Sequence, residues 1–251
     1  PLTGSNRIFV RWGLQLLPST KNAGLRAIMK ELDTPDKKLN SAHISFGIAP
    51  VVNAVGRLSH AAEAVDLLTH LDDELATGAA KHLVSVNRER QHVQRTIVNE
   101  ALQRIEESSL HQEPMIILKN DTWARGVVGV AAGKCIETYF SPTILFAKDG
   151  DNLVGSARSI SGFSIFDALQ HCQQHIVKFG GHDMAAGLTI KHEEFTPFVE
   201  AMTAYAREAI APEQRIRTVQ PDVLADVHEI THTIAVEIEK LGPFGIGNPT
   251  P

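Results

Sequence analysis

The 251-residue sequence is poor in cysteine and lacks long apolar runs. Its two cysteines, Cys135 and Cys172, lie in separate apolar helical patterns without a CxxC partner, which excludes a disulfide scaffold and a cysteine-based zinc site. So few cysteines point to a reducing compartment, and we expect a cytoplasmic protein. The longest apolar runs, such as 115–118 and 126–132, are far shorter than the roughly 20 residues that span a bilayer. We therefore expect no membrane segment.

An excess of positive charge is also missing. The formal net charge is -5 and the pI is about 6.2, whereas general binding to nucleic acid depends on a basic surface that releases counterions from phosphates. Nucleic-acid binding would therefore need a local patch. Residues 1–7 contain no initiator methionine and no signal segment, so we expect a chain that begins inside a longer protein or has been processed. Hydrophobic residues make up 43% of the chain, enough for a sizeable core.

Helical spacing dominates the first half of the sequence. Apolar residues recur at helical intervals between residues 7 and 70, and prolines predict breaks at 18–20, at 34–36 and at Pro50. A stretch without proline or internal glycine then runs from Ala79 to about Leu110, with charges on most of its faces. A helix with so much polar surface is expected to connect two lobes rather than to lie in a core.

After Pro114 the pattern changes to short β-branched runs. Two predicted strands flank a predicted helix at 127–139, which forms a βαβ unit and implies a parallel strand pair. The fold class is therefore α/β. The predicted strands cover residues 115–118, 143–146, 153–156 and 185–190, with a short one near Val223, and the later helices cover 166–172, 194–210 and 231–241.

The most specific local cluster is the glycine-rich segment from Lys178 to Gly187. Gly180 and Gly181 allow a tight turn that exposes successive N–H groups as an anion-binding nest, and His182 can donate to a phosphate oxygen. The small residues that follow would let a ligand approach the next strand closely. A tight turn with a buried, hydrogen-bonded histidine explains the same residues equally well. The spacing alone leaves both interpretations open.

A second cluster follows Gly155. In strand geometry Ser156 and Arg158 project to the same face, so a hydroxyl and a guanidinium can grip one phosphate together, with the Ser159 hydroxyl adjacent to them. An exposed arginine on an edge strand is the alternative interpretation. The cluster is therefore a candidate anion site that the sequence alone does not establish.

Three other segments carry weaker signals. Arg125 lies at a strand-to-helix junction, where helix N–H groups attract anions, and its neighbour Trp123 is expected to pack rather than to stack on a base. Arg57 ends a segment with proline, asparagine and glycine that we interpret as a loop. The motif from His228 to His232 matches HExxH, but the pair is predicted to straddle a helix boundary, so we expect no zinc there.

Taken in order, six segments resemble the RecJ-type single-strand-specific DNA exonucleases of the DHH phosphoesterase family. They are Asn6–Ile8, Phe46–Leu58, Trp123–Gly129, Gly155–Ser159, Phe179–Gly187 and Pro243–Pro249. The resemblance covers essentially the whole chain. It implies the helical C-terminal part of a DHH domain at 1–78, a connector helix at 79–112, a small DHH-associated domain with a mixed sheet and the GGH motif at 113–211, and a linker at 212–251 towards a missing OB-fold.

The resemblance also implies an activity. Such enzymes hydrolyse single-stranded DNA from the 5′ end with Mn²⁺ or Mg²⁺ in DNA repair and recombination, and their metal ligands lie upstream of the segment matching Asn6–Arg7. We therefore expect no catalytic residue and no metal in this chain, which should be inactive alone. The predicted ligands of the nucleic acid and its end phosphate are Arg57, Ser156, Arg158, Ser159, Gly180, Gly181 and His182, with Arg125 and Lys178 as additional candidates. Ala124 stands where such chains usually have histidine.

Two other functions remain open at this point. The segment could bind nucleic acid or another partner without hydrolysis, or it could belong to a DHH-family phosphodiesterase that acts on short oligonucleotides or cyclic dinucleotides. The exit segment Pro243–Pro249 argues against the second of these, because those small enzymes need no onward OB-fold. The partners that we expect are single-stranded DNA and the missing DHH and OB-fold domains of the same protein.

Overall fold

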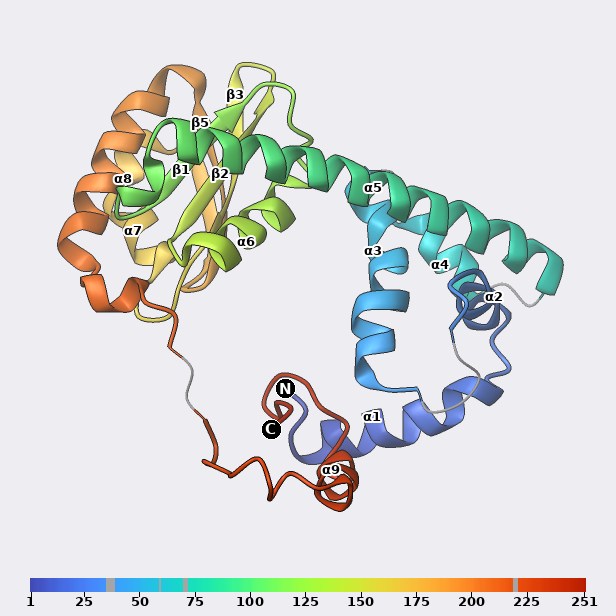
Figure 1. Cartoon of the computed structure of the whole chain (residues 1–251). Coiled ribbons are helices and arrows are strands. Elements are labelled where there is room, and N and C mark those ends of the chain that lie inside the picture. Colours follow the sequence, from blue (N-terminus) through green and yellow to red (C-terminus); the bar gives the residue numbers. More distant parts are fainter. Residues whose placement is uncertain (35–38, 59, 70–71, 219–220) are drawn as a thin grey trace. The chain divides into compact units, whose positions relative to one another are not determined.

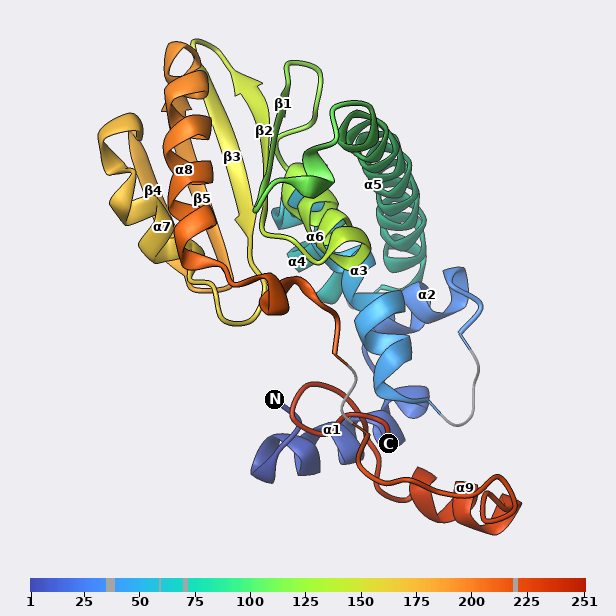
Figure 2. The same ribbon diagram turned by 60° about the vertical axis from the view of Figure 1, so that its left-hand side comes forward.

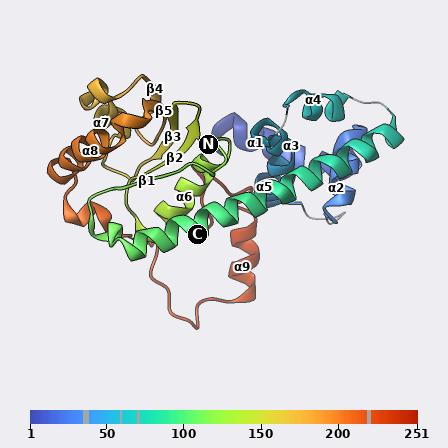
Figure 3. The same cartoon turned by 90° about the horizontal axis from the view of Figure 1, so that it is seen from above.

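The computed structural model describes residues 1–34, 39–58, 60–69, 72–218 and 221–251. The chain divides into two compact units, the first made of residues 1–89 with 219–251 and the second of residues 90–218. The boundary falls inside α5 (Asp73–Glu107), which is one uninterrupted helix (Figure 3). No helix in the described ranges is long and apolar enough to cross a membrane.

The first unit is helical, as the apolar spacing predicts. Its core is formed by fully buried aliphatic side chains such as Ile28, Leu67 and Leu83. The Asn22 side chain caps one helix by accepting a hydrogen bond from the Leu25 N–H at 2.9 Å. Besides the first half of α5, the helices are α1 (Gly4–Leu16), α2 (Ala23–Glu31), α3 (Ala49–Leu58), α4 (Ala62–Thr69) and α9 (His232–Glu239).

Two boundaries in this unit differ from the predictions. The chain does not break at Pro50: a π-helix at His43–Ile48 runs directly into α3, and Pro50 is the second residue of α3. The predicted loop ending at Arg57 is therefore wrong, and Arg57 lies in the last turn of α3. Helix α5 begins at Asp73 rather than at Ala79. The break predicted at 34–36 falls partly outside the described residues.

The second unit is built on a five-stranded mixed sheet, which confirms the α/β prediction. Strand order is β1-β2-β3-β5-β4; β1 and β2 are parallel, and the remaining pairs are antiparallel. The strands are β1 (Ile116–Asn120), β2 (Thr143–Asp149), β3 (Asn152–Arg158), β4 (Lys178–His182) and β5 (Ala185–Lys191). The predicted βαβ unit is present, with α6 (Val128–Tyr139) between the parallel strands.

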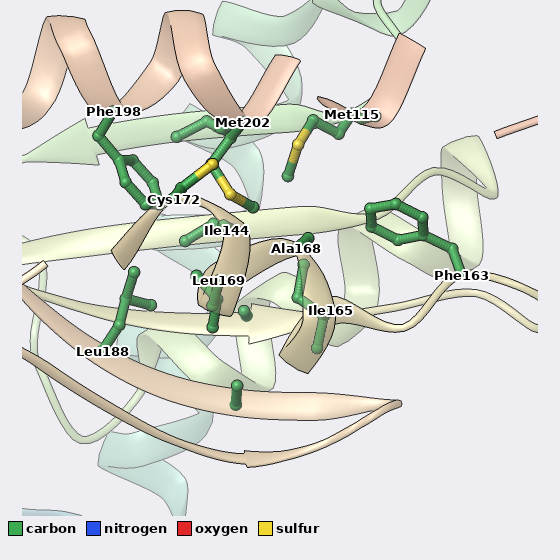
Figure 4. Close-up of a cluster of buried hydrophobic side chains, with 14 of the residues drawn as sticks. Met115, Ile144, Phe163, Ile165, Ala168, Leu169, Cys172, Leu188, Phe198 and Met202 are labelled. Atoms are coloured by element: carbon green, nitrogen blue, oxygen red, sulfur yellow. The ribbon is translucent and has the colours of Figure 1, made fainter. Parts of the chain in front are cut away.

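Helices cover the two sides of this sheet differently. Helices α7 (Ile165–His171) and α8 (Phe195–Ala209) lie on one side, and α6 with the C-terminal part of α5 lies on the other (Figures 1 and 2). The main core lies beneath α7 and α8, where Phe198 and Met202 meet strand residues such as Ile144 and Leu188 (Figure 4). The sheet is thus anchored by a packed core on one side.

The segment after Pro212 contradicts one prediction. No strand forms near Val223, whose side chain is 76% exposed, and the described residues 221–230 contain only turns and irregular backbone. A strand needs a partner to satisfy its N–H and C=O groups, and an apolar run cannot supply one by itself. The helix predicted at 231–241 is present as the shorter α9, with Thr231 as its N-cap.

Candidate nucleic-acid interface

Ser156 and Arg158 occupy alternate positions of β3 and point away from the core beneath α7 and α8. Arg158 Nη1 donates hydrogen bonds to Ser156 Oγ at 3.0 Å and to the Ala157 carbonyl at 2.8 Å. Both side chains are half-buried. The prediction that Ser156 and Arg158 share a face is confirmed. The Arg158 guanidinium is fixed by hydrogen bonds to residues of its own strand. β3 is a central strand, so the edge-strand alternative is wrong.

The first turn of α6 lies directly against this pair. A Cβ atom added at Gly129 would be 2.7 Å from Ser156 Oγ and 3.1 Å from an Arg158 Nη atom. Glycine therefore permits an approach that a larger residue would block. The Val128, Val130 and Ala131 N–H groups of this turn donate to the Ala124 and Val127 carbonyls, so the turn would attract an anion mainly through the partial positive charge of the helix N-terminus. The Ser156 hydroxyl, the Arg158 guanidinium and the N-terminus of α6 thus lie next to one another. Each of these groups interacts favourably with a phosphate.

The strand register places residues of β4 and β5 on the same face of the sheet as Ser156 and Arg158. Arg158 pairs with Ala185 of β5, which pairs with His182 of β4, and Ser156 pairs in the same way with Gly187 and then Gly180. Directly paired residues share a face of a sheet. We call Ser156, Arg158, Gly187, Gly180 and His182 the open patch, because its β4 and β5 members are exposed. Arg158 and His182 are two strands apart, about 10 Å.

The glycine-rich segment is part of this patch, but not as the predicted turn. Gly180 and Gly181 lie within β4, and the chain reverses afterwards at Asp183–Met184. Gly181 has φ 154°, and a Cβ there would lie 2.3 Å from the Ala185 carbonyl oxygen. Close approach of the neighbouring strand, rather than a turn, requires this glycine. Nothing lies within 4 Å of a Cβ added at Gly180 or at Gly187. We call the exposed backbone of these two glycines the floor of the open patch.

His182 is exposed at the end of β4, so the interpretation as a buried histidine is wrong. Its Nδ1 accepts a hydrogen bond from the Met184 N–H at 3.3 Å. In the neutral ring this contact assigns the proton to Nε2, which can then donate to a ligand on the patch. The geometry therefore agrees with the proposed use of His182 as a phosphate donor.

Ser159 and Lys178 are also predicted ligands, and the structure places them differently: Ser159 lies outside the open patch, and Lys178 lies on its face. Ser159 is buried, and its hydroxyl donates to the Phe163 carbonyl at 2.6 Å, so it stabilises the turn after β3 and does not join the patch. Lys178 is exposed on β4, and its pairing with Thr189 places it on the same face as Gly180 and His182. Lys178 thus extends the patch along β4.

Arg125 and Arg57 lie elsewhere. Arg125 is exposed in the connection between β1 and α6, where it pairs with Asp149 at 2.6 Å. Arg57 is exposed on α3 of the first unit and is described there only. Their roles as ligands stay predictions. Sequence reasoning missed Gly129, although a small residue in the first turn of a helix after a strand is the signal that could have indicated it.

The HExxH-like motif from His228 to His232 straddles a helix boundary, as predicted. His228 lies in a turn and His232 is the first residue of α9, so the two do not share the face of one continuous helix. Among the described residues, no group of three or more His, Cys, Asp or Glu side chains could hold a metal ion.

Both cysteines are free and buried, and burial raises the pKa of the Cys135 thiol to about 11.

Comparison with known proteins gives consistent matches. Residues 112–208 match the family described as the DHHA1 domain. The whole chain is 34% identical to a single-stranded-DNA-specific exonuclease RecJ of Bacillus subtilis and 30% identical to that of Escherichia coli. It covers 32% and 45% of those two proteins. The chain therefore spans less than half the length of these curated relatives.

The structural comparison agrees. A crystal structure of RecJ from Thermus thermophilus in complex with Mn²⁺ matches the whole chain with a TM-score of 0.89 at 28% identity, and the match covers 37% of that protein. A second structure of the same protein in complex with Mg²⁺ matches with a TM-score of 0.86. The α/β unit and the helical unit therefore both have counterparts in a solved fold.

Proposed function

We propose that this chain, which contains a DHHA1 domain and is similar along its whole length to RecJ exonucleases, binds single-stranded DNA by its 5′-terminal phosphate. It would do so within a longer, metal-dependent exonuclease that acts in DNA repair and recombination. The observation that carries the proposal is the convergence of Arg158, Ser156 and the first turn of α6 at one point of the sheet.

The three groups suit a terminal phosphate better than an internal one. A terminal phosphate carries more negative charge and more free oxygens than a phosphodiester, so a guanidinium, a hydroxyl and a helix N-terminus can each contact a separate oxygen. A 5′-hydroxyl end offers neither the charge nor those acceptors. The site would therefore distinguish the two kinds of end.

The rest of the open patch would support the nucleotides that follow. Gly187 and Gly180 present bare backbone, which lets a sugar or base approach the sheet closely, and His182 and Lys178 border this floor with N–H donors. Arg158 and Lys178 together supply a local positive charge that would attract the backbone of a single strand without reading its sequence. The net charge of -5 is compatible with such a local site.

Hydrolysis needs groups that these residues do not provide. RecJ structures hold Mn²⁺ or Mg²⁺, and metal ions in such enzymes activate water and stabilise the leaving oxygen. The described part of this chain offers no group of side chains fitted to hold such an ion. The residues of the patch would instead fix the position of the phosphate, which contributes to rate by orientation alone.

The test compares two short oligonucleotides that differ only in having a 5′-phosphate or a 5′-hydroxyl. Fluorescence anisotropy at low salt gives a dissociation constant for each, and we call their ratio the phosphate preference. Wild type is expected to prefer the phosphate, and Arg158→Ala to lose most of that preference, because a charge-assisted hydrogen bond contributes about 1.5–3 kcal/mol. The matched control is Arg207→Ala, which removes an arginine of α8 that pairs with Glu113.

Equal affinity of wild type for both ends would contradict the proposal. So would an equal loss of preference in the two arginine variants, because a general charge effect would then explain the binding. In the same samples we expect no Mn²⁺-dependent cleavage by the isolated chain. Cleavage that Arg158→Ala abolishes would show that the chain carries its own catalytic centre.

A further inference from the structure

Glu100 of α5 contacts the segment that leads into the first turn of α6. Its Oε2 atom accepts two hydrogen bonds, from Trp123 Nε1 at 2.7 Å and from Asn120 Nδ2 at 3.1 Å. Trp123 is only 5% exposed and Glu100 is half-buried. Hydrogen bonds to a charged acceptor that is partly shielded from water are stronger than neutral ones. One carboxylate oxygen thus ties the end of β1 and the following loop to α5.

Arg104 holds the same segment one helical turn further along α5. Its Nη1 donates to the Lys119 carbonyl at 3.1 Å, and its guanidinium lies 5.8 Å from the centre of the Trp123 ring, within the range of a cation–π contact. Residues four apart on a helix lie on one face. Glu100 and Arg104 therefore contact the indole from neighbouring positions on one face of α5.

The path from Trp123 to the phosphate site is short and hydrogen-bonded. The N–H groups of Val127 and Val128 both donate to the Ala124 carbonyl, at 2.9 and 3.2 Å, and both valines are buried. Gly129 follows at once and lies against Ser156 Oγ. A displacement of Trp123 would therefore be passed along a tight turn to the helix terminus that faces the phosphate.

We propose that Glu100 is a positioning residue for the end-phosphate site: it acts through Trp123 to fix the first turn of α6 above Ser156 and Arg158. This inference rests on the proposed function. A helix N-terminus that is already in place when the ligand arrives avoids the entropic cost of ordering it, and binding is tighter as a result. Without Glu100 the arginine and serine would remain, but the third element of the site would lose its fixed position.

The experiment measures phosphate preference and the emission of Trp123 in the full 251-residue chain. Trp12→Phe removes the other tryptophan, so that emission reports Trp123 alone. Glu100→Ala is expected to lower the phosphate preference about ten-fold, the size of one lost polar contact, and to shift the emission to longer wavelength as water reaches the indole. Glu100→Gln keeps an acceptor oxygen, although a neutral and weaker one, and is expected to retain most of the phosphate preference and an emission maximum close to that of wild type.

Two further variants separate positioning from simple loss of stability or charge. Trp123→Phe keeps an aromatic ring but removes the N–H donor, and it should lower the preference as Glu100→Ala does. Glu107→Ala removes an exposed carboxylate of the same helix that accepts a hydrogen bond from Gln103 at 2.7 Å, and it should change neither readout. Circular dichroism of each variant verifies that the chain is folded under the conditions of binding.

The outcomes are distinct. A folded Glu100→Ala variant with wild-type phosphate preference would overturn the inference and leave the proposed function standing. A Glu100→Gln variant that loses as much preference as Glu100→Ala would also overturn it, because charge rather than position would then be the cause. A wild-type chain without any phosphate preference would overturn the proposed function itself, and the inference with it.

Discussion

The two faces of the β3–β5 strand pair differ in burial and polarity, although successive residues of the same two strands supply them in turn. On the face beneath α7 and α8, Ala157 and Leu188 are buried in the core. On the opposite face their neighbours Ser156 and Gly187 belong to the open patch, where Gly187 is exposed and Ser156 is half-buried. One face therefore holds the unit together, and this allows the other to be polar, glycine-rich and only partly covered.

The difference also explains why the register must be strict. A slip of one residue would exchange the two faces, moving Arg158 into the core and Ala157 to the ligand side. Gly155 shows how the core enforces the register, because a Cβ there would lie 2.5 Å from the Phe146 ring. Only glycine fits opposite this phenylalanine. Packing on the closed face therefore sets the geometry of the open one.

The largest expected effect comes from the closed face. Phe146 is fully buried and meets Phe195 and Phe198 edge to face, with ring centres 5.9 and 5.7 Å away. Phe146→Ala removes these contacts and leaves a cavity, so the free energy of unfolding should fall by about 3–5 kcal/mol. Urea unfolding, followed by Trp123 emission in the Trp12→Phe background, measures this change in the unit that contains both residues.

Ile216→Ala is the control in the same unit, because this isoleucine is 61% exposed. A surface substitution of this kind should change the free energy of unfolding by no more than about 0.5 kcal/mol. If Phe146→Ala were equally mild, the closed face would not be the source of stability that its contrast with the open face requires.

The next effect concerns the part of the ligand-side face that α6 covers. Cys135 is fully buried on α6, and burial raises the pKa of its thiol from 9.0 to about 11. The folded chain therefore holds this proton more tightly than the unfolded chain. The resulting contribution to stability is complete below about pH 9 and is lost as the pH rises towards 11.

Thiol alkylation measures this protection. At one pH between 7 and 8, the native thiol should react about 100-fold more slowly than the thiol of the urea-unfolded chain, because two pKa units reduce the thiolate fraction by about that factor. Mass spectrometry of peptides distinguishes Cys135 from Cys172. Rapid alkylation of native Cys135 would show that α6 does not close this part of the face.

Gly180 and Gly181 test the border between the two kinds of face. Gly181→Ala would place a Cβ 2.3 Å from a backbone oxygen at φ 154°, and we expect about 1–3 kcal/mol of destabilisation from the strain. Gly180→Ala meets nothing within 4 Å and should leave the urea midpoint nearly unchanged while weakening DNA binding, because its methyl group covers the floor. Equal effects of the two substitutions on stability would remove this distinction.

Much of the second unit could be predicted from local pattern. The two β-branched runs around the 127–139 helix indicate the parallel pair, and strand alternation is enough to place Ser156 and Arg158 on one face. Both predictions rest on periodicity, which the chain carries locally. Of the small residues at 185–187 that were expected to permit close approach, Gly187 is exposed on the open patch, whereas Ala186 is buried in the core.

What could not be predicted depends on partners distant in the sequence. Adjacent glycines are typical of turns, and only the close approach of Ala185 and Ala186 shows why Gly181 belongs to a strand. Glu100 resembles any other charge on a polar helix, because its donors Asn120 and Trp123 lie 20 and 23 residues away. An apolar run near Val223 suggested a strand that no neighbouring strand completes in the described residues.

The smallest expected effect separates the two parts of the ligand-side face. Lys178 lies on β4 and would contact the DNA backbone rather than the end phosphate, so Lys178→Ala should leave the phosphate preference unchanged. It should reduce the slope of log affinity against log salt by about 0.7, the value for one phosphate contact on a single strand. Lys134→Ala, on α6 where the lysine pairs with Glu137 at 2.6 Å, is the control and should alter neither quantity. If Lys178→Ala leaves the salt slope unchanged, the DNA-binding surface is limited to the Ser156–Arg158 end of the patch. If Lys178→Ala instead lowers the phosphate preference, β4 contacts the end phosphate as well.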